Sequence, residues 1–223
     1  MPAGTSLGSG LAGFHVDPDG VSYVTGIVGS SSVNDIQTTS FAPDGTTRWS
    51  VTYDSGKSGD QARGIARGPG NLLYVVGNTP GPSDFANVLV LVYDATNGAL
   101  LKTIQYSSGP GTSEFGAGVV GDLAGNIYVI GGTVGDGPDV MTVKFNSAGA
   151  VQWRKVWDGA AFPPLDQDGP VKILLDSSGN VLSCISGYMA GGHPDYVVVK
   201  YAPLNGATLW EATFGVTGGR FPG

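Results

Sequence analysis

The chain of 223 residues contains four copies of one segment, and this internal repeat restricts its fold more than any other feature. Each copy begins with a polar turn rich in Gly and leads into an apolar stretch: residues 17–26, 68–77, 122–131 and 176–187. One column of the alignment is aromatic in three copies, at intervals of 51, 54 and 55 residues: Tyr23, Tyr74, Tyr128 and Ser183. Repeats of this length indicate an array of equal structural units.

A second apolar stretch follows each first one and ends at a turn glycine: Gly45, Gly98, Gly149 and Gly206. Four residues later, three of the four copies have Trp: Trp49, Lys102, Trp153 and Trp210. Four residues further, every copy is aromatic: Tyr53, Tyr106, Trp157 and Phe214. Because these columns recur, we expect them to pack between units rather than to bind a ligand. In the third copy the pattern predicts strands at about 117–121, 126–132, 140–146 and 151–157.

The composition favours short strands joined by tight turns. The chain has 38 Gly and 14 Pro, and 41% of its residues are hydrophobic. Charged residues make up 13%, about half the usual share, which disfavours long exposed helices. We therefore predict an all-β fold, a β-propeller built of four four-stranded antiparallel blades that pack face to face. We expect one domain over residues 1–223, with blades at about 11–57, 58–110, 111–161 and 162–215.

The best copy, residues 122–153, reads Asp-x-x-Gly-Asn-Ile-Tyr-Val-x-Gly, then Asp-x-x-x-x-Lys-Phe, then Gly-x-x-x-Trp. This pattern resembles the bacterial seven-bladed β-propeller repeat family, abbreviated SBBP, over residues 11–215. The resemblance implies a bacterial secreted or cell-surface protein, and it implies no catalytic residue. The N-terminal residues do not form a signal-peptide pattern, so a cytoplasmic location stays open.

Each repeat begins with the first expected strand of a blade and ends with the fourth. Neither end of the sequence therefore shows an additional strand that could complete another blade. Three ways of completing the ring follow. The four blades could close alone, which is the smallest propeller. Two chains could pair as a homodimer that forms one eight-bladed ring. The chain could also be a fragment of a longer propeller.

Charge and composition exclude several classes of function. A net charge of −7 without basic runs disfavours nucleic-acid binding. No apolar run is long enough to span a membrane as a helix. Cys184 is the only cysteine, so it forms no internal disulfide, and we expect it in the core. We expect no metal and no cofactor, because zinc-ligand spacing and the calcium-loop pattern are absent, and we interpret Asp17 and Asp19 as turn residues.

The candidate binding residues lie on the first strand of each blade and on the loops that enter it, where a propeller forms the mouth of its channel. Alignment on Asp17, Arg67, Asp122 and Asp176 places two columns on one face: Gly13, Arg63, Gly118 and Lys172, and His15, Ile65, Val120 and Leu174. The entering loops carry four acids: Asp60, Glu114, Asp166 and Asp168. The candidate ligand-binding set is therefore Asp60, Arg63, Glu114, Asp166, Asp168, Lys172 and His15. The simpler interpretation is that these charges solvate a loop rim and satisfy turn amides.

Three hypotheses of function follow. The first is a non-catalytic binding or scaffold propeller that engages a protein or glycan partner through the channel mouth and variable loops such as 79–87. The second is a hydrolase or lyase that uses Asp60, Glu114, Asp166 and His15 for acid–base chemistry. The third is a purely structural propeller fragment that self-associates.

Overall fold

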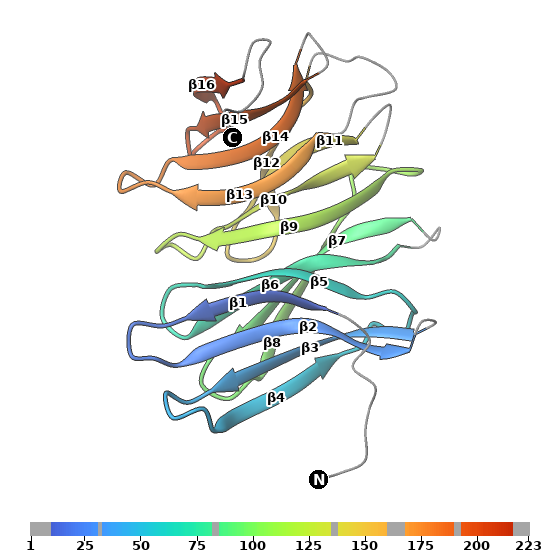
Figure 1. Cartoon of the computed structure of the whole chain (residues 1–223), viewed down its shortest axis with the longest axis vertical. Helices are drawn as coiled ribbons and strands as arrows, with labels where there is room; N and C mark the ends of the chain where they lie inside the picture. The colour runs from blue at the N-terminus through green and yellow to red at the C-terminus, as the bar shows by residue number, and fades with distance from the viewer. Residues whose placement is uncertain are drawn as a thin grey trace, which may run out of the picture.

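The computed structural model describes residues 10–30, 33–81, 85–134, 138–159, 168–189 and 193–215, and it is all-β. Sixteen strands form four antiparallel sheets of four strands, and each sheet takes its strands in chain order (Figure 1). These ranges contain no helix, and so none that could cross a membrane. The predicted fold of four four-stranded antiparallel sheets is confirmed.

The four sheets, which we call blades 1 to 4, have the following strands. Blade 1 contains β1 (Leu11–Val16), β2 (Ser22–Ser30), β3 (Val33–Phe41) and β4 (Thr47–Tyr53). Blade 2 contains β5 (Gln61–Arg67), β6 (Leu72–Pro80), β7 (Ala86–Asp94) and β8 (Leu100–Tyr106). Blade 3 contains β9 (Ser113–Gly121), β10 (Ile127–Val134), β11 (Pro138–Phe145) and β12 (Val151–Trp157). Blade 4 contains β13 (Gly169–Leu175), β14 (Val181–Met189), β15 (His193–Tyr201) and β16 (Thr208–Phe214).

The first strands of consecutive blades lie against one another: β1 against β5, β5 against β9, and β9 against β13. This approach is close, because a Cβ atom on Gly64 would lie only 2.8 Å from the carbonyl oxygen of Ala117. Glycine is therefore required where these backbones meet.

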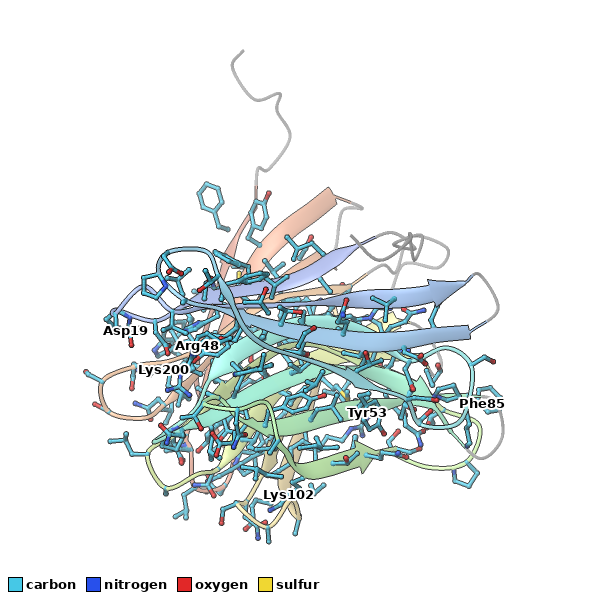
Figure 2. All side chains as sticks on the ribbon, turned by 90° about the horizontal axis from the view of Figure 1, so that it is seen from below. Asp19, Arg48, Tyr53, Phe85, Lys102 and Lys200 are labelled. Carbon is cyan, nitrogen blue, oxygen red and sulfur yellow. The ribbon has the colours of Figure 1, made fainter. Side chains whose placement is uncertain are left out.

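The connections between strands gather at two edges of the molecule. Figure 2 shows Asp19, Arg48 and Lys200 at one edge, which we call the turn rim because it holds the tight turns inside each blade. Phe85 lies at the other edge, the linker rim, which holds the links between blades and the loops between the second and third strands.

Carboxylates close the tight turns of the turn rim. Asp122 accepts hydrogen bonds from the main-chain nitrogens of Ala124 (3.0 Å) and Asn126 (2.9 Å), and Gly125 has the positive φ of 79° that the turn requires. Asp19 likewise accepts from the nitrogen of Val21 (3.1 Å). The interpretation of Asp17 and Asp19 as turn residues is confirmed, because Asp17 closes the same turn through main-chain hydrogen bonds with Gly20 and Val21.

An apolar core fills each junction between consecutive blades, so each inner sheet is buried on both faces. In β7, alternate residues enter different junctions: Leu89 packs toward blade 1 and Val90 toward blade 3. Both are fully buried. This explains why the second and third strands of blade 2 are almost continuously hydrophobic.

The hydrogen-bond register corrects our alignment of the fourth copy. Leu182 pairs with Lys200 just as Tyr128 pairs with Lys144, so Leu182, and not Ser183, occupies the tyrosine column. Cys184, expected in the core, is half-buried. The turns that precede β10 and β14 have the same length, and this equal length determines the register.

The register also corrects the second copy. Gly64 pairs with Val76 as Gly118 pairs with Ile130, so Gly64 is the equivalent of Gly118. Arg63 lies at the β-bulge before Gly64 and does not share a column with Lys172.

Within the part of the chain that the structure describes, no blade covers the outer face of either end blade. Blade 1 and blade 4 lie at opposite ends of the longest axis (Figure 1). Phe14 on blade 1 is 60% exposed, and Phe214 on blade 4 is 71% exposed. A ring closed by the four blades alone is therefore not confirmed.

Candidate functional site at the linker rim

Three acids of the predicted set occupy one equivalent position, just before or at the start of the first strand of blades 2, 3 and 4. They are Asp60, Glu114 and Asp168, and all three are buried. Each accepts a hydrogen bond from a main-chain nitrogen of its own linker: Ser55 to Asp60 (2.8 Å), Ser108 to Glu114 (3.0 Å) and Gly159 to Asp168 (2.9 Å). The acids therefore hold the links between blades in one conformation.

Two further carboxylates join Asp60 at the junction of blades 1 and 2. Asp35 comes from β3 and Asp54 directly follows β4, and one carboxylate oxygen from each of the three residues lies within 4.8 Å of the others. Oδ1 of Asp35 and Oδ1 of Asp60 are buried and have no hydrogen-bond partner. Burial, followed by the charges of Asp54 and Asp60, raises the pKa of Asp35. We call these three residues the first acid trio.

The same arrangement recurs at the junction of blades 3 and 4. Asp139 on β11, Asp158 after β12 and Asp168 before β13 also bring carboxylate oxygens within 4.8 Å of one another. Their places in the fold match those of Asp35, Asp54 and Asp60. We call Asp139, Asp158 and Asp168 the second acid trio.

The junction of blades 2 and 3 has a different chemistry at the equivalent positions. Asn87 and Ser107 replace two of the acids, and Glu114 is the only acid of the three positions. A pocket of ≈ 460 Å³ opens here, and it is lined by Gly81, Phe85, Asn87, Gln105, Ser107 and 109–112. The side chain of Phe85 is 44% exposed beside this neutral polar lining. The pocket can therefore accept an uncharged ligand.

His15 belongs to the turn rim and not to the acids. Its Nε2 atom lies 3.2 Å from Oδ1 of Asp17, and Arg67 Nε lies 3.0 Å from Oδ2 of the same carboxylate. The ring of Tyr23 completes this cluster between blades 1 and 2. The structure thus does not bring His15 together with Asp60 and Glu114, as the hydrolase or lyase hypothesis requires.

The two predicted basic residues also lie apart. Arg63 donates to the side chain of Asn78 (3.1 Å), and its guanidinium lies 4.5 Å from the ring centroid of Phe115. Lys172 is exposed on β13. Asp166 lies outside the described residues.

Sequence reasoning missed Asp35, Asp54, Asp139 and Asp158. A signal was available, because Asp35 and Asp139 open the second apolar unit of their copies, and Asp54 and Asp158 directly follow the aromatic column. The predicted set contains residues of the first strand and its entering loop alone. The junction instead collects residues from the ends of three different strands.

The end face of blade 4 repeats the columns that fill the inner junctions. Trp49 and Trp153 are nearly buried and donate their indole N–H groups across the junction, to the carbonyl oxygens of Ala95 (3.0 Å) and Pro203 (3.1 Å). The equivalent Trp210 is 42% exposed. We define the blade 4 end face by its exposed side chains: Leu174, Tyr196, Trp210 and Phe214.

The end face of blade 1 offers the complementary positions. Phe14 is the equivalent of Val119 and Ile173, which are buried against the preceding blade. A hollow of ≈ 220 Å³ lies beside it, with Leu11, Val24 and Gln37 in its lining. We define the blade 1 end face as Leu11, Phe14, Val24, Gln37 and Thr39.

Comparison with known proteins supports the fold alone. No protein-family model matches the chain, and no curated protein matches it. The chain is similar to quinohemoprotein alcohol dehydrogenase from Comamonas testosteroni, at 16% identity and a TM-score of 0.59, over 91% of this chain and 35% of that one.

Two other solved structures give the same result. The quinohemoprotein alcohol dehydrogenase ADHIIG from Pseudomonas putida HK5 is 15% identical with a TM-score of 0.56, over 91% of this chain and 36% of that one. A europium-containing methanol dehydrogenase is 11% identical with a TM-score of 0.51, over 83% of this chain and 40% of that one. The chain thus spans about a third of the length of the first two structures. These neighbours identify the fold as propeller-like.

Proposed function

We propose that the protein is a non-catalytic scaffold propeller that acts by self-association. The blade 4 end face of one copy packs against the blade 1 end face of a second copy, and two copies complete one ring through two equal contacts, which we call seams. The observation that carries this proposal is that a single chain exposes both halves of an inner junction.

The tryptophan column supports the pairing in detail. Trp49 lies against Gly98 and Trp153 against Gly206, where a Cβ atom on either glycine would come within 2.8 Å of the indole ring. The equivalent turn glycine of blade 1, Gly45, has nothing within 4 Å of such an atom. Trp210 of one copy fits over Gly45 of the other, with the carbonyl oxygen of Pro43 as its acceptor.

Tyr196 supplies a second fit. Its equivalents at the inner junctions, Ile36 of blade 1 and Val140 of blade 3, are fully buried against the following blade, whereas Tyr196 is 58% exposed. Ile36 packs in the same cluster as Val75 and Leu89, which are the equivalents of Val24 and Gln37. The hollow on blade 1 that these two residues line is therefore the seat for Tyr196.

Light scattering on a gel-filtration column tests the proposal. We expect a mass twice that of the 22.7 kDa chain. Trp210→Ala and Phe14→Glu should each give the single-chain mass, whereas Leu123→Ser, which removes a 96% exposed side chain outside both end faces, should leave the mass doubled.

Mixing the two variants distinguishes head-to-tail pairing from other arrangements. Trp210→Ala keeps an intact blade 1 end face, and Phe14→Glu keeps an intact blade 4 end face. Their equimolar mixture should therefore form a heterodimer in which the two unmodified end faces form one seam. If only Trp210→Ala dissociates the dimer, blade 4 pairs with itself and the proposal is wrong. A wild type of single-chain mass at all concentrations would also overturn it, and the end faces would then belong to further blades or to another protein.

The pocket between blades 2 and 3 supports a second function for the same scaffold, the binding of a neutral glycan. An exposed aromatic ring beside amide and hydroxyl groups is a lining that suits the apolar face and the hydroxyl groups of a sugar. A glycan array of neutral oligosaccharides should show binding that Phe85→Ala abolishes. Binding that survives Phe85→Ala and Asn87→Ala, or no binding to the array, would contradict this function.

A further inference from the structure

We propose that the first acid trio binds one divalent cation with a preference for oxygen ligands, Ca²⁺ above all. The protein would then hold one ion per chain, between blades 1 and 2. This inference is independent of the association of the end faces.

The first argument is the ligand chemistry of the first acid trio. Three carboxylates from Asp35, Asp54 and Asp60 converge within 4.8 Å, and hard cations such as Ca²⁺ select carboxylate oxygens. Among the residues that the structure describes, no lysine or arginine forms an ion pair with any of the three. The nearby Lys57 donates instead to the carbonyl oxygens of Pro80 (3.3 Å) and Gly81 (3.1 Å).

The second argument is the unsatisfied oxygen of a fully buried residue. Asp60 has no exposed surface, and its Oδ2 atom is occupied by the main chain of Ser55. Its Oδ1 atom has no partner, and neither does Oδ1 of Asp35. A buried carboxylate oxygen without a hydrogen bond destabilises the fold unless another ligand satisfies it. A cation between the three carboxylates supplies that ligand.

The third argument comes from the middle junction, where Glu114 also has a buried oxygen without a partner, Oε2, but belongs to no acid trio of the described residues. Asn87 and Ser107 occupy the places of Asp35 and Asp54, and the link between blades 2 and 3 still adopts the same arrangement. Joining two blades therefore does not require three acids. The additional carboxylates of Asp35 and Asp54 at the junction of blades 1 and 2 need a different reason, and a bound cation provides one.

The exposure of the first acid trio suits ion entry. Asp54 is exposed, whereas Asp60 is buried. An ion can thus reach the trio from the linker rim and contact the buried acid. The exposed member is also the safest residue to change without disturbing the core.

Calorimetric titration of the EDTA-treated protein with CaCl₂ tests the proposal. We expect one bound ion per chain with a dissociation constant below about 1 mM. Asp54→Asn should remove this ion. Asp19→Asn, which changes an exposed turn acid on the opposite rim, should leave the ion bound.

A gain of function sharpens the test. Asn87→Asp combined with Ser107→Asp recreates a trio with Glu114, and this variant should bind a second ion. Absence of calcium-dependent heat and of any rise in melting temperature in the wild type would overturn the proposal. So would a bound ion that persists in the Asp54→Asn variant, once gel filtration has shown that the variant is folded.

Discussion

The face of blade 3 that packs against blade 4 and the end face of blade 4 carry the same residue columns in the same register. Only the face of blade 3 is covered. Trp153 and Trp157 of blade 3 are less than 9% exposed, whereas Trp210 and Phe214 of blade 4 are 42% and 71% exposed. The lysine column differs as well. Lys144 reaches across the junction to the carbonyl oxygen of Pro203 (2.7 Å), whereas Lys200 turns back to Asp176 of its own blade (2.6 Å). Each repeat thus carries the residues of an inner junction, whether or not a neighbouring blade covers them.

Truncation of the two equivalent tryptophans should give the largest contrast. Trp153→Ala removes a buried ring and its hydrogen bond, so it should lower the free energy of unfolding by about 3–5 kcal/mol. Trp210→Ala should change it by less than about 1 kcal/mol when urea denaturation is measured at a concentration too low for association. Equal losses at both positions would mean that the two faces have the same surroundings in solution.

The linker acids should give the next largest effect. Glu114→Ala leaves the main-chain nitrogen of Ser108 without its partner inside the middle junction, and this should cost about 1–3 kcal/mol in urea denaturation. Glu114→Gln keeps an acceptor and should recover most of the loss. If both variants lose the same stability, the negative charge and not the hydrogen bond holds the linker.

A smaller effect concerns the blade 1 end face, which is more polar than any inner face. Gln37 and Thr39 hydrogen-bond with Ser50, whereas blade 2 has Leu89 and Leu91 at the same positions as Gln37 and Thr39. The double variant Gln37→Leu and Thr39→Val should tighten association roughly 5- to 30-fold through added apolar burial, measured by sedimentation. Unchanged or weaker association would show that this face does not form the seam.

The smallest effect concerns the ion pair on the blade 4 end face. Lys200, followed by Asn180, holds the pKa of Asp176 well below its usual range. Because the folded-state pKa is lowered, the pair stabilises the protein above the unfolded pKa near 3.9, and this contribution is lost as the pH falls through the folded value. Asp176→Asn should therefore lower the melting temperature slightly at neutral pH, and the difference should disappear in strong acid. A difference independent of pH would contradict the assignment to this ion pair.

The strands and junction columns could be predicted from the sequence because they rest on local patterns. Turn glycines and repeated aromatics such as Trp49 and Trp153 locate the blades, and both tryptophans pack in junctions as expected. Alignment by residue type placed Ser183 and Arg63 one position away from their true columns. A shift by one residue moves a side chain to the other face of a sheet, so only the ladder of hydrogen bonds could settle these two positions.

The candidate site was predictable only in part. The buried acids Asp60, Glu114 and Asp168 share a position that the repeat itself reveals. Their neighbours could not be inferred from the first strand alone, because Asp35 and Asp54 reach the same point from two other strands. The place of His15 could not be inferred for a related reason. His15 lies on the expected strand but near the end opposite the acids, beside Arg67.

Each chain has one blade 4 end face and one blade 1 end face, and this has a consequence for how the proposed two-chain ring forms. Once the first seam has joined two copies, their remaining faces are held near each other, and the second seam forms at a high effective concentration. The two seams then open and close as a linked pair. A substitution that weakens each seam tenfold should weaken the complete ring about a hundredfold, because the ring contains the same contact twice.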